Sequence, residues 1–219
     1  MDEIIITLAN GKFFSPDNLD LVVLMNLRNL PRGYQYAGVP PHDNYTVLDH
    51  SVESVIIGAK YWDWCEEQGE NPILEAFPRS LITKWGKGVY EMAKEKFVRF
   101  CLMHDWAEAI VGDLNPSLKD DTYRRKEDMV QKAVLNYLGF ESELRTAERQ
   151  DVMKKHLKIV DLISSLWEVK QLVNRGYDSV RNIYGCRKAL LEEHVPWQEI
   201  KGFVTDMGAF MAPEEYEDN

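Results

Sequence analysis

Long apolar runs and a basic leader are both missing from this chain of 219 residues. No stretch approaches the roughly 20 apolar residues that a membrane-spanning helix needs. The first residues, MDEIIITLANGK, lack a basic segment followed by a long apolar core, which a secretory signal would have. These absences predict a cytoplasmic protein that does not enter a membrane.

Cysteine and positive charge are also scarce. The three cysteines, Cys65, Cys101 and Cys186, are widely spaced and form no CxxC pair, which argues against a disulfide framework and a zinc ribbon. The formal net charge of -10 disfavours extended binding to nucleic acid, because that binding rests on many Lys and Arg contacts to phosphates. A small anionic substrate remains compatible, provided that a local cluster of positive charge, a metal ion included, holds it.

What the chain does contain is typical of one soluble globular domain. Hydrophobic residues make up 45% of the sequence and charged residues 28%, which excludes disordered and fibrous proteins. We expect a single domain over residues 1–219. Residues 69–88 contain Gly, Pro and Trp and could be an insertion that forms a lid or an oligomer contact. Residues 212–219 are expected to be a loose acidic tail.

Turn and capping signals predict an all-α fold behind a short N-terminal β-hairpin. The hairpin is expected because β-branched residues flank Asn10 and Gly11, a turn pair. An ordered loop should follow the first helix, from residue 31 to 44, and Thr46 or Asp49 should cap the next helix. Apolar spacing predicts helices over about 19–30, 47–67, 89–111, 120–138 and 147–174 (or from 142), then from 178 and from 196.

Ionisable residues interrupt the apolar run from Phe97 to Val111. His104, Asp105 and Glu108 are spaced so that their side chains converge on one side of a helix. An unpaired buried carboxylate is costly, and a metal ion would offset two carboxylates and an imidazole together. The alternative is a buried polar patch whose members hydrogen-bond one another.

Asp161 is the second unusual carboxylate. It lies in the apolar helical run HLKIVDLISSLWEV, with the small residues Ser164 and Ser165 beside it, and an interior Asp in such a place is either paired or a ligand. His50 also has apolar neighbours. Taken alone it is more typical of a satisfied core histidine than of a ligand.

The order of these residues resembles a known family. His50, then His104-Asp105, then Asp161 resembles the H…HD…D pattern of the HD-domain metal-dependent phosphohydrolases, and HDWAEAIVGDLNPSLK is similar to the matching stretch of the YfbR-type 5'-deoxynucleotidases and their phage relatives. The opening resembles the phage branch in YTVLDHS and in a loop with Arg32, Gly33, Tyr34 and Gly38. The resemblance implies an HD-domain helical bundle.

The resemblance also implies a metal site and roles for its neighbours. One divalent transition metal would be coordinated, and the ligand set does not distinguish Co, Mn, Zn, Ni and Fe. Glu108 would position or deprotonate the attacking water, and Asp113 would contact the sugar hydroxyl. The implied ligands are His50, His104, Asp105 and Asp161.

Substrate contacts are implied less directly. Arg32 would hold phosphate through its planar fork, and Lys119 would add charge nearby. Tyr34, Tyr36 or Tyr45 would stack on a base. The proline of the GDL turn is displaced by one residue, to Pro116, relative to the family pattern.

Several functions follow from this interpretation. The leading prediction is release of phosphate from a deoxynucleoside 5'-monophosphate, a small-molecule substrate; the alternative is a dATP-type triphosphohydrolase that releases triphosphate. Arg124, Arg125 and Lys126 could hold a triphosphate, although a solvated helix face is the preferred interpretation of these residues. The acidic balance disfavours a nuclease. A non-enzymatic HD regulatory domain is weakened because the implied ligands and Glu108 all occur together. We also expect a homo-oligomer.

Overall fold

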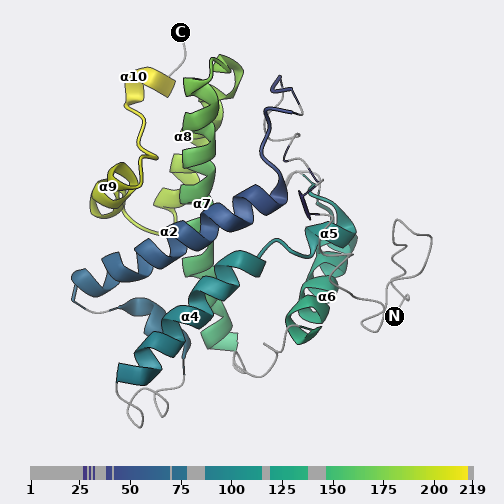
Figure 1. Ribbon diagram of the computed structural model, residues 1–219, viewed down its shortest axis with the longest axis vertical. Helices are drawn as coiled ribbons and strands as arrows, with labels where there is room; N and C mark the ends of the chain where they lie inside the picture. The colour runs from purple at the N-terminus through teal and green to yellow at the C-terminus, as the bar shows by residue number, and fades with distance from the viewer. Residues whose placement is uncertain are drawn as a thin grey trace.

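A computed structural model describes residues 27–28, 30, 32, 38–40, 42–69, 71–77, 87–114, 119–137 and 147–216. These residues form helices, turns and connecting segments, with no strand of more than a single bridge residue among them, so the expected all-α class is confirmed for this part of the chain. The expected hairpin and most of the expected 19–30 helix lie outside the described residues. Figure 1 shows α2 crossing in front of α7, with α5 and α6 to one side of the crossing and α9 and α10 to the other.

The helix bounds agree closely with the sequence pattern in the C-terminal half. The long helix expected from 142 or 147 to 174 runs from Ala147 to Asn174 without a break, and Gly176 follows it with a positive φ of 95°. The helices and 3₁₀ turns are α2 (Val47–Glu67), η3 (Pro72–Ala76), α4 (Lys87–Met103), α5 (Glu108–Val111), α6 (Asp121–Tyr137), α7 (Ala147–Asn174), η5 (Asp178–Val180), α8 (Arg181–Glu192), α9 (Trp197–Asp206) and α10 (Pro213–Tyr216).

Helix α7 forms the centre of the molecule. It packs against α2, α4, α8 and η3, so apolar residues on more than one of its faces are removed from water. Its apolar residues are therefore spread over several faces and do not form one stripe. Its fully buried apolar residues are Val160, Leu162, Ile163, Leu166, Val169 and Leu172.

The start of α2 is fixed by local hydrogen bonds. Thr46 is the N-cap: its side chain accepts from the backbone N–H of Asp49, and the Asp49 carboxylate accepts from the Thr46 N–H. This reciprocal capping box confirms the expected helix start. The Arg32 N–H donates to the carbonyl of Tyr45 at 2.8 Å, which holds the preceding loop against the same helix end.

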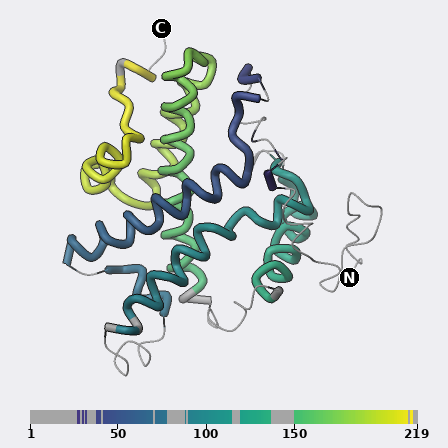
Figure 2. The backbone as a smooth tube through the Cα atoms, in the orientation of Figure 1, coloured from purple at the N-terminus to yellow at the C-terminus, as the bar shows by residue number. Residues whose placement is uncertain are grey.

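The helix expected over 89–111 is wrong in its middle, because it breaks at residues 104–107. In an unbroken helix the Ala107 N–H would donate to the carbonyl of Met103. Instead the side-chain amide of Gln131 from α6 inserts between them: it accepts from the Ala107 N–H at 3.2 Å and donates to the Met103 carbonyl at 2.9 Å. The inserted side chain separates α4 from α5. Figure 2 traces the chain through this turn.

Two segments differ from the expectations for loops. Within the expected insertion, Pro72–Ala76 form η3 with Asn71 as its N-cap, and Ile73, Ala76 and Phe77 are buried in the main core. This part is core structure and not a lid. In the expected loose tail, Pro213–Tyr216 form α10, and the Tyr216 ring packs on Tyr184 with 4.8 Å between ring centroids.

Within the described residues, no helix is both long enough and apolar enough to cross a membrane.

Candidate metal centre

Three segments far apart in sequence meet beside the crossing of α2 and α7. His50 lies in the first turn of α2, His104 and Asp105 lie in the break after α4, and Asp161 lies in the middle of α7. One ligand atom from each of these four residues lies within 4.8 Å of all the others. The structure therefore brings together the four residues that the sequence pattern singled out.

His50 is held in place from two sides. Its ring is fully buried, and its Nδ1 lies 2.8 Å from Oε1 of Glu168 and 3.2 Å from the Ser164 hydroxyl. Its Nε2 lies 3.2 Å from Oδ1 of Asp161 and 3.6 Å from Oδ2 of Asp105, without the direction that a hydrogen bond requires. The room beside Ser164 that the sequence indicated is filled by this imidazole.

His104 is held by the backbone instead. Its Nδ1 lies 2.7 Å from the carbonyl oxygen of Cys101, one turn earlier in α4. A carbonyl can only accept, so Nδ1 carries a proton and the neutral ring keeps its lone pair on Nε2. That Nε2 is buried and makes no hydrogen bond, and it lies 3.2 Å from Oδ2 of Asp105.

This donor set fits a divalent transition metal. Two imidazole nitrogens and two carboxylates are the ligands that such ions take. Four atoms within 4.8 Å of one another lie at most about 2.9 Å from a common centre, and bonds to such an ion are about 2.0–2.2 Å, so closing the four side chains on an ion requires shifts of less than about 1 Å. The two buried Nε2 atoms without hydrogen bonds are the atoms that would bind it.

The carboxylates at the centre are stabilised in their charged form. Burial alone would raise the pKa of Asp105, but the imidazole of His104 lowers it below the ordinary value. Burial would likewise raise the pKa of Asp161, yet Lys158, whose Nζ lies 2.5 Å from Oδ2, holds it well below the ordinary value. Both groups therefore carry the negative charge that a cation needs.

The pKa of Glu108 is shifted in the opposite direction from those of Asp105 and Asp161. It opens α5, is nearly fully buried, and has an Oε2 without a hydrogen bond. Burial raises its pKa well above the ordinary value, and the carboxylates of Asp105 and Asp113 add to the effect. A carboxyl with a raised pKa beside a cluster of metal ligands has the chemistry of a general acid or base.

Arg32 lies at the site but faces protein carboxylates. Only 3% of it is exposed; its Nη1 donates to Oδ2 of Asp105 at 3.3 Å, and its Nε lies 3.6 Å from Oε2 of Glu168. Lys119 forms an ion pair with Glu127 at 2.6 Å, although its charge also acts on Glu108. The phosphate-binding roles of Arg32 and Lys119 stay predictions.

The aromatic residues expected to stack on a base are only partly described. Tyr34 and Tyr36 lie outside the described residues. Tyr45 is buried, and its ring meets Trp167 edge-on with 6.0 Å between centroids. Tyr45 is therefore a core residue, and of the three tyrosines it is the one already packed against protein.

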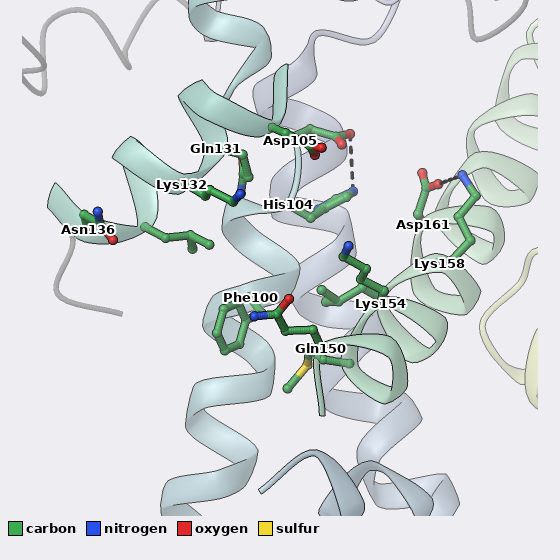
Figure 3. A pocket seen from close by; sticks show the side chains of 14 residues that line it. Phe100, His104, Asp105, Gln131, Lys132, Asn136, Gln150, Lys154, Lys158 and Asp161 are labelled. Atoms are coloured by element: carbon green, nitrogen blue, oxygen red, sulfur yellow. Dashed lines mark hydrogen bonds and ion pairs between the residues drawn. The ribbon is translucent and has the colours of Figure 1, made fainter. Parts of the chain in front are cut away.

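A cavity of about 600 Å³ opens beside the ligands, between α4, α6 and α7. His104, Asp105 and Asp161 form part of its wall, and Phe100 and Met153 lie at its apolar side. Lys132 from α6 and Lys154 and Lys158 from α7 also line it, as the close view in Figure 3 shows. The lining is therefore mixed in charge, because Asp105, Asp128 and Asp161 stand beside the three lysines and Lys158 pairs with Asp161.

Sequence reasoning missed Glu168 and the three cavity lysines. Glu168 follows Asp161 by seven residues and Ser164 by four, so an acidic residue on the same face of an apolar helix was an available signal. The lysines gave no signal, because α6 and α7 are amphipathic or mixed helices on which a lysine is ordinary. Arg124 and Arg125 are exposed, as the preferred interpretation of a solvated face expected, and they do not line the cavity.

Comparisons of the chain with models of known protein families, with curated proteins and with solved structures gave no match. The HD-family resemblance of the sequence therefore stays a prediction.

Proposed function

We propose that this protein is a metal-dependent phosphohydrolase that acts on deoxynucleotides. The observation that carries the proposal is the cluster of His50, His104, Asp105 and Asp161, in which two buried imidazole Nε2 atoms and two ionised carboxylates face one another. The deoxynucleotide part rests on the resemblance of the HDWAEAIVGDLNPSLK segment.

The residues of the chain divide the work of hydrolysis among them. A divalent cation, when bound, would polarise the phosphoryl group and supply an activated water. Glu108 receives the proton of the attacking water, as its raised pKa and its place beside Asp105 support. Asp113 binds the sugar hydroxyl. Lys158 keeps the Asp161 carboxylate oriented and charged.

Release of phosphate from a deoxynucleoside 5'-monophosphate is the leading reaction. The second candidate, release of triphosphate from a deoxynucleoside triphosphate, is favoured by the cavity. The cavity of about 600 Å³ has more room than one phosphate requires, and Lys132 and Lys154 in its wall offer positive charge, while Lys158 pairs with Asp161. Two further phosphates could lie along these lysines.

One assay separates the two reactions and tests both. The purified protein is incubated with Mn²⁺ or Co²⁺ and each of the four deoxynucleoside monophosphates, then with the four triphosphates, and the products are separated by chromatography. Free phosphate released from the monophosphates supports the leading reaction. Deoxynucleoside and inorganic triphosphate released from a deoxynucleoside triphosphate support the second. The absence of product with both sets of substrates would contradict the proposal and favour a regulatory domain.

The lysine cavity can be tested separately on whichever substrate is turned over. Lys154→Met should raise KM for a triphosphate several-fold while leaving a monophosphate nearly unaffected, because only the triphosphate reaches this wall. Lys155→Met is the matched control, since Lys155 is the exposed neighbour on α7 that does not line the cavity. Equal behaviour of the two variants would exclude the cavity as the triphosphate site.

A further inference from the structure

Glu168 is the most completely enclosed carboxylate near the metal centre. None of its surface is exposed, and it lies on α7 two turns beyond Asp161. Oε1 lies 2.8 Å from Nδ1 of His50, and Oε2 lies 3.6 Å from Nε of Arg32. A fully buried carboxylate is costly unless it is paired and hydrogen-bonded, and His50 and Arg32 are such partners for Glu168.

The contact with His50 decides where that ring keeps its proton. An ionised carboxylate only accepts hydrogen bonds, so Nδ1 must donate to Oε1. The Nε2 lone pair of a neutral ring is then left facing Asp161, Asp105 and His104. The Ser164 hydroxyl, also 3.2 Å from Nδ1, cannot impose this choice, because a hydroxyl both donates and accepts.

We propose that Glu168 is the positioning residue of the metal centre. It keeps the Nδ1 proton of His50 in place and orients the ring, so that Nε2 is the nitrogen that gives up its proton and binds the cation. The proposal rests on the metal site of the proposed function. A carboxylate that accepts from a ligating imidazole raises the basicity of the ligand and holds its direction.

The two histidines of the centre thus reach the same state by different means. His104 obtains its Nδ1 acceptor from the Cys101 carbonyl, which no substitution of a side chain removes. His50 obtains its acceptor from a side chain on another helix, 118 residues away in sequence. Only the second arrangement can be changed by a single substitution.

The first test measures metal affinity. Titration of metal-free protein with Co²⁺ should show roughly 10- to 100-fold weaker binding in Glu168→Gln than in the wild type, because the amide must serve both Arg32 and His50 with one oxygen. Glu53→Gln is the matched control: the Glu53 carboxyl lies within 4.8 Å of His50 and Glu168, so this variant makes the same carboxyl-to-amide change in the same place without touching Nδ1 of His50. Glu53→Gln should bind Co²⁺ as the wild type does.

The second test reads the tautomer and needs no variant. In the Zn²⁺-loaded wild type, ¹⁵N-labelled at histidine, the ring of His50 should show a slowly exchanging proton on Nδ1 and a metal-bound Nε2. A metal-bound Nδ1, or a proton on Nε2, would overturn the proposal even if Glu168→Gln failed to fold. A purely structural Glu168 would alter the melting temperature of the variant without altering the affinity of the folded protein.

The outcomes separate this inference from the proposed function. If the wild type binds Co²⁺ and Glu168→Gln binds it equally well, the role of Glu168 is wrong and the metal centre stands. If the wild type binds neither Co²⁺ nor Zn²⁺, the metal centre and the role of Glu168 are both wrong.

Discussion

Helices α2 and α7 meet at two buried histidines, and the two contacts are built differently. Near the start of α2, His50 faces the carboxylates of Glu168 and Asp161. Three turns further along, Tyr61 of α2 places its hydroxyl 3.0 Å from Nδ1 of His156 on α7. Both histidines are almost completely removed from solvent.

The pKa values of the two histidines are shifted in opposite directions. Burial and Arg32 oppose the charged form of His50, but Glu168 and Asp161 outweigh them and raise its pKa to about 9. Burial, with a smaller effect from Lys155, lowers the pKa of His156 to about 4. Burial therefore favours the neutral form of a histidine, as at His156. At His50 the neighbouring carboxylates outweigh burial and favour the positively charged form.

Removal of a ligand at the first contact should have the largest effect. Asp161→Ala, and equally Asp105→Ala, should abolish binding of a divalent cation, because each removes one of two anionic ligands. Metal content after dialysis, measured by mass spectrometry, checks this outcome. His156→Gln, at the second contact, is the control and should retain the ion. Stoichiometric metal in Asp161→Ala would show that the cluster is not the binding site.

Replacement of Glu108 should slow turnover without removing the metal ion. Glu108→Gln keeps the shape of a buried residue that is no proposed ligand, so the ion should remain bound. Turnover should fall by a factor on the order of 100 or more, because the proton acceptor is lost. The kcat of metal-loaded Glu108→Gln, with metal content measured on the same sample, decides the matter. Full activity in this variant would remove Glu108 from the mechanism.

The two histidines should give opposite pH dependences of stability in metal-free protein. The lowered pKa of His156 means that its contribution is present above pH 6.5 and is lost as the pH falls through about 4. The raised pKa of His50 means that its contribution is present below pH 6.5 and is lost as the pH rises through about 9. The lowering of the His156 pKa from 6.5 to about 4 corresponds to on the order of 3 kcal/mol in the free energy of unfolding.

Urea unfolding in the presence of a chelator, from pH 4 to pH 9, checks these slopes. Relative to the wild type, His156→Gln should lose less stability on the acid side, and His50→Gln should lose less on the alkaline side. The same slope in both variants would contradict the difference drawn between the contacts.

The hydroxyl of Tyr61 should contribute least. Tyr61→Phe removes one hydrogen bond to His156, which should lower the free energy of unfolding by about 1 kcal/mol. Its aromatic contacts with Trp64 and Phe97 remain. Denaturant unfolding measures the change, and Co²⁺ affinity should be the same as in the wild type. A lower Co²⁺ affinity in Tyr61→Phe would mean that the two contacts are coupled through α2.

The sequence predicted the elements whose signals are local. The capping residue Thr46 and the extent of α7 follow from short-range spacing, and His104, Asp105 and Asp161 stand out as ionisable residues in apolar runs. The addition of His50, which completes the set of four, was implied by the family resemblance alone. The apolar run around Asp161 marked this carboxylate as unusual before any partner was known.

Features that depend on distant partners could not be predicted in this way. The break between α4 and α5 requires the amide of Gln131, and nothing in residues 97–111 reports its presence. The tautomer of His50 is set by Glu168 on another helix. Likewise, η3 is core structure because Ile73 packs against α7, although its Gly- and Pro-rich surroundings are typical of a loop.

The most direct test is anomalous diffraction from crystals of the protein grown with Co²⁺. The account predicts one strong peak at which His50 Nε2, His104 Nε2, Asp105 and Asp161 all lie within about 2.0–2.3 Å of the ion. A structure with Co²⁺ bound elsewhere, or with these four side chains around no ion at saturating Co²⁺, would contradict it.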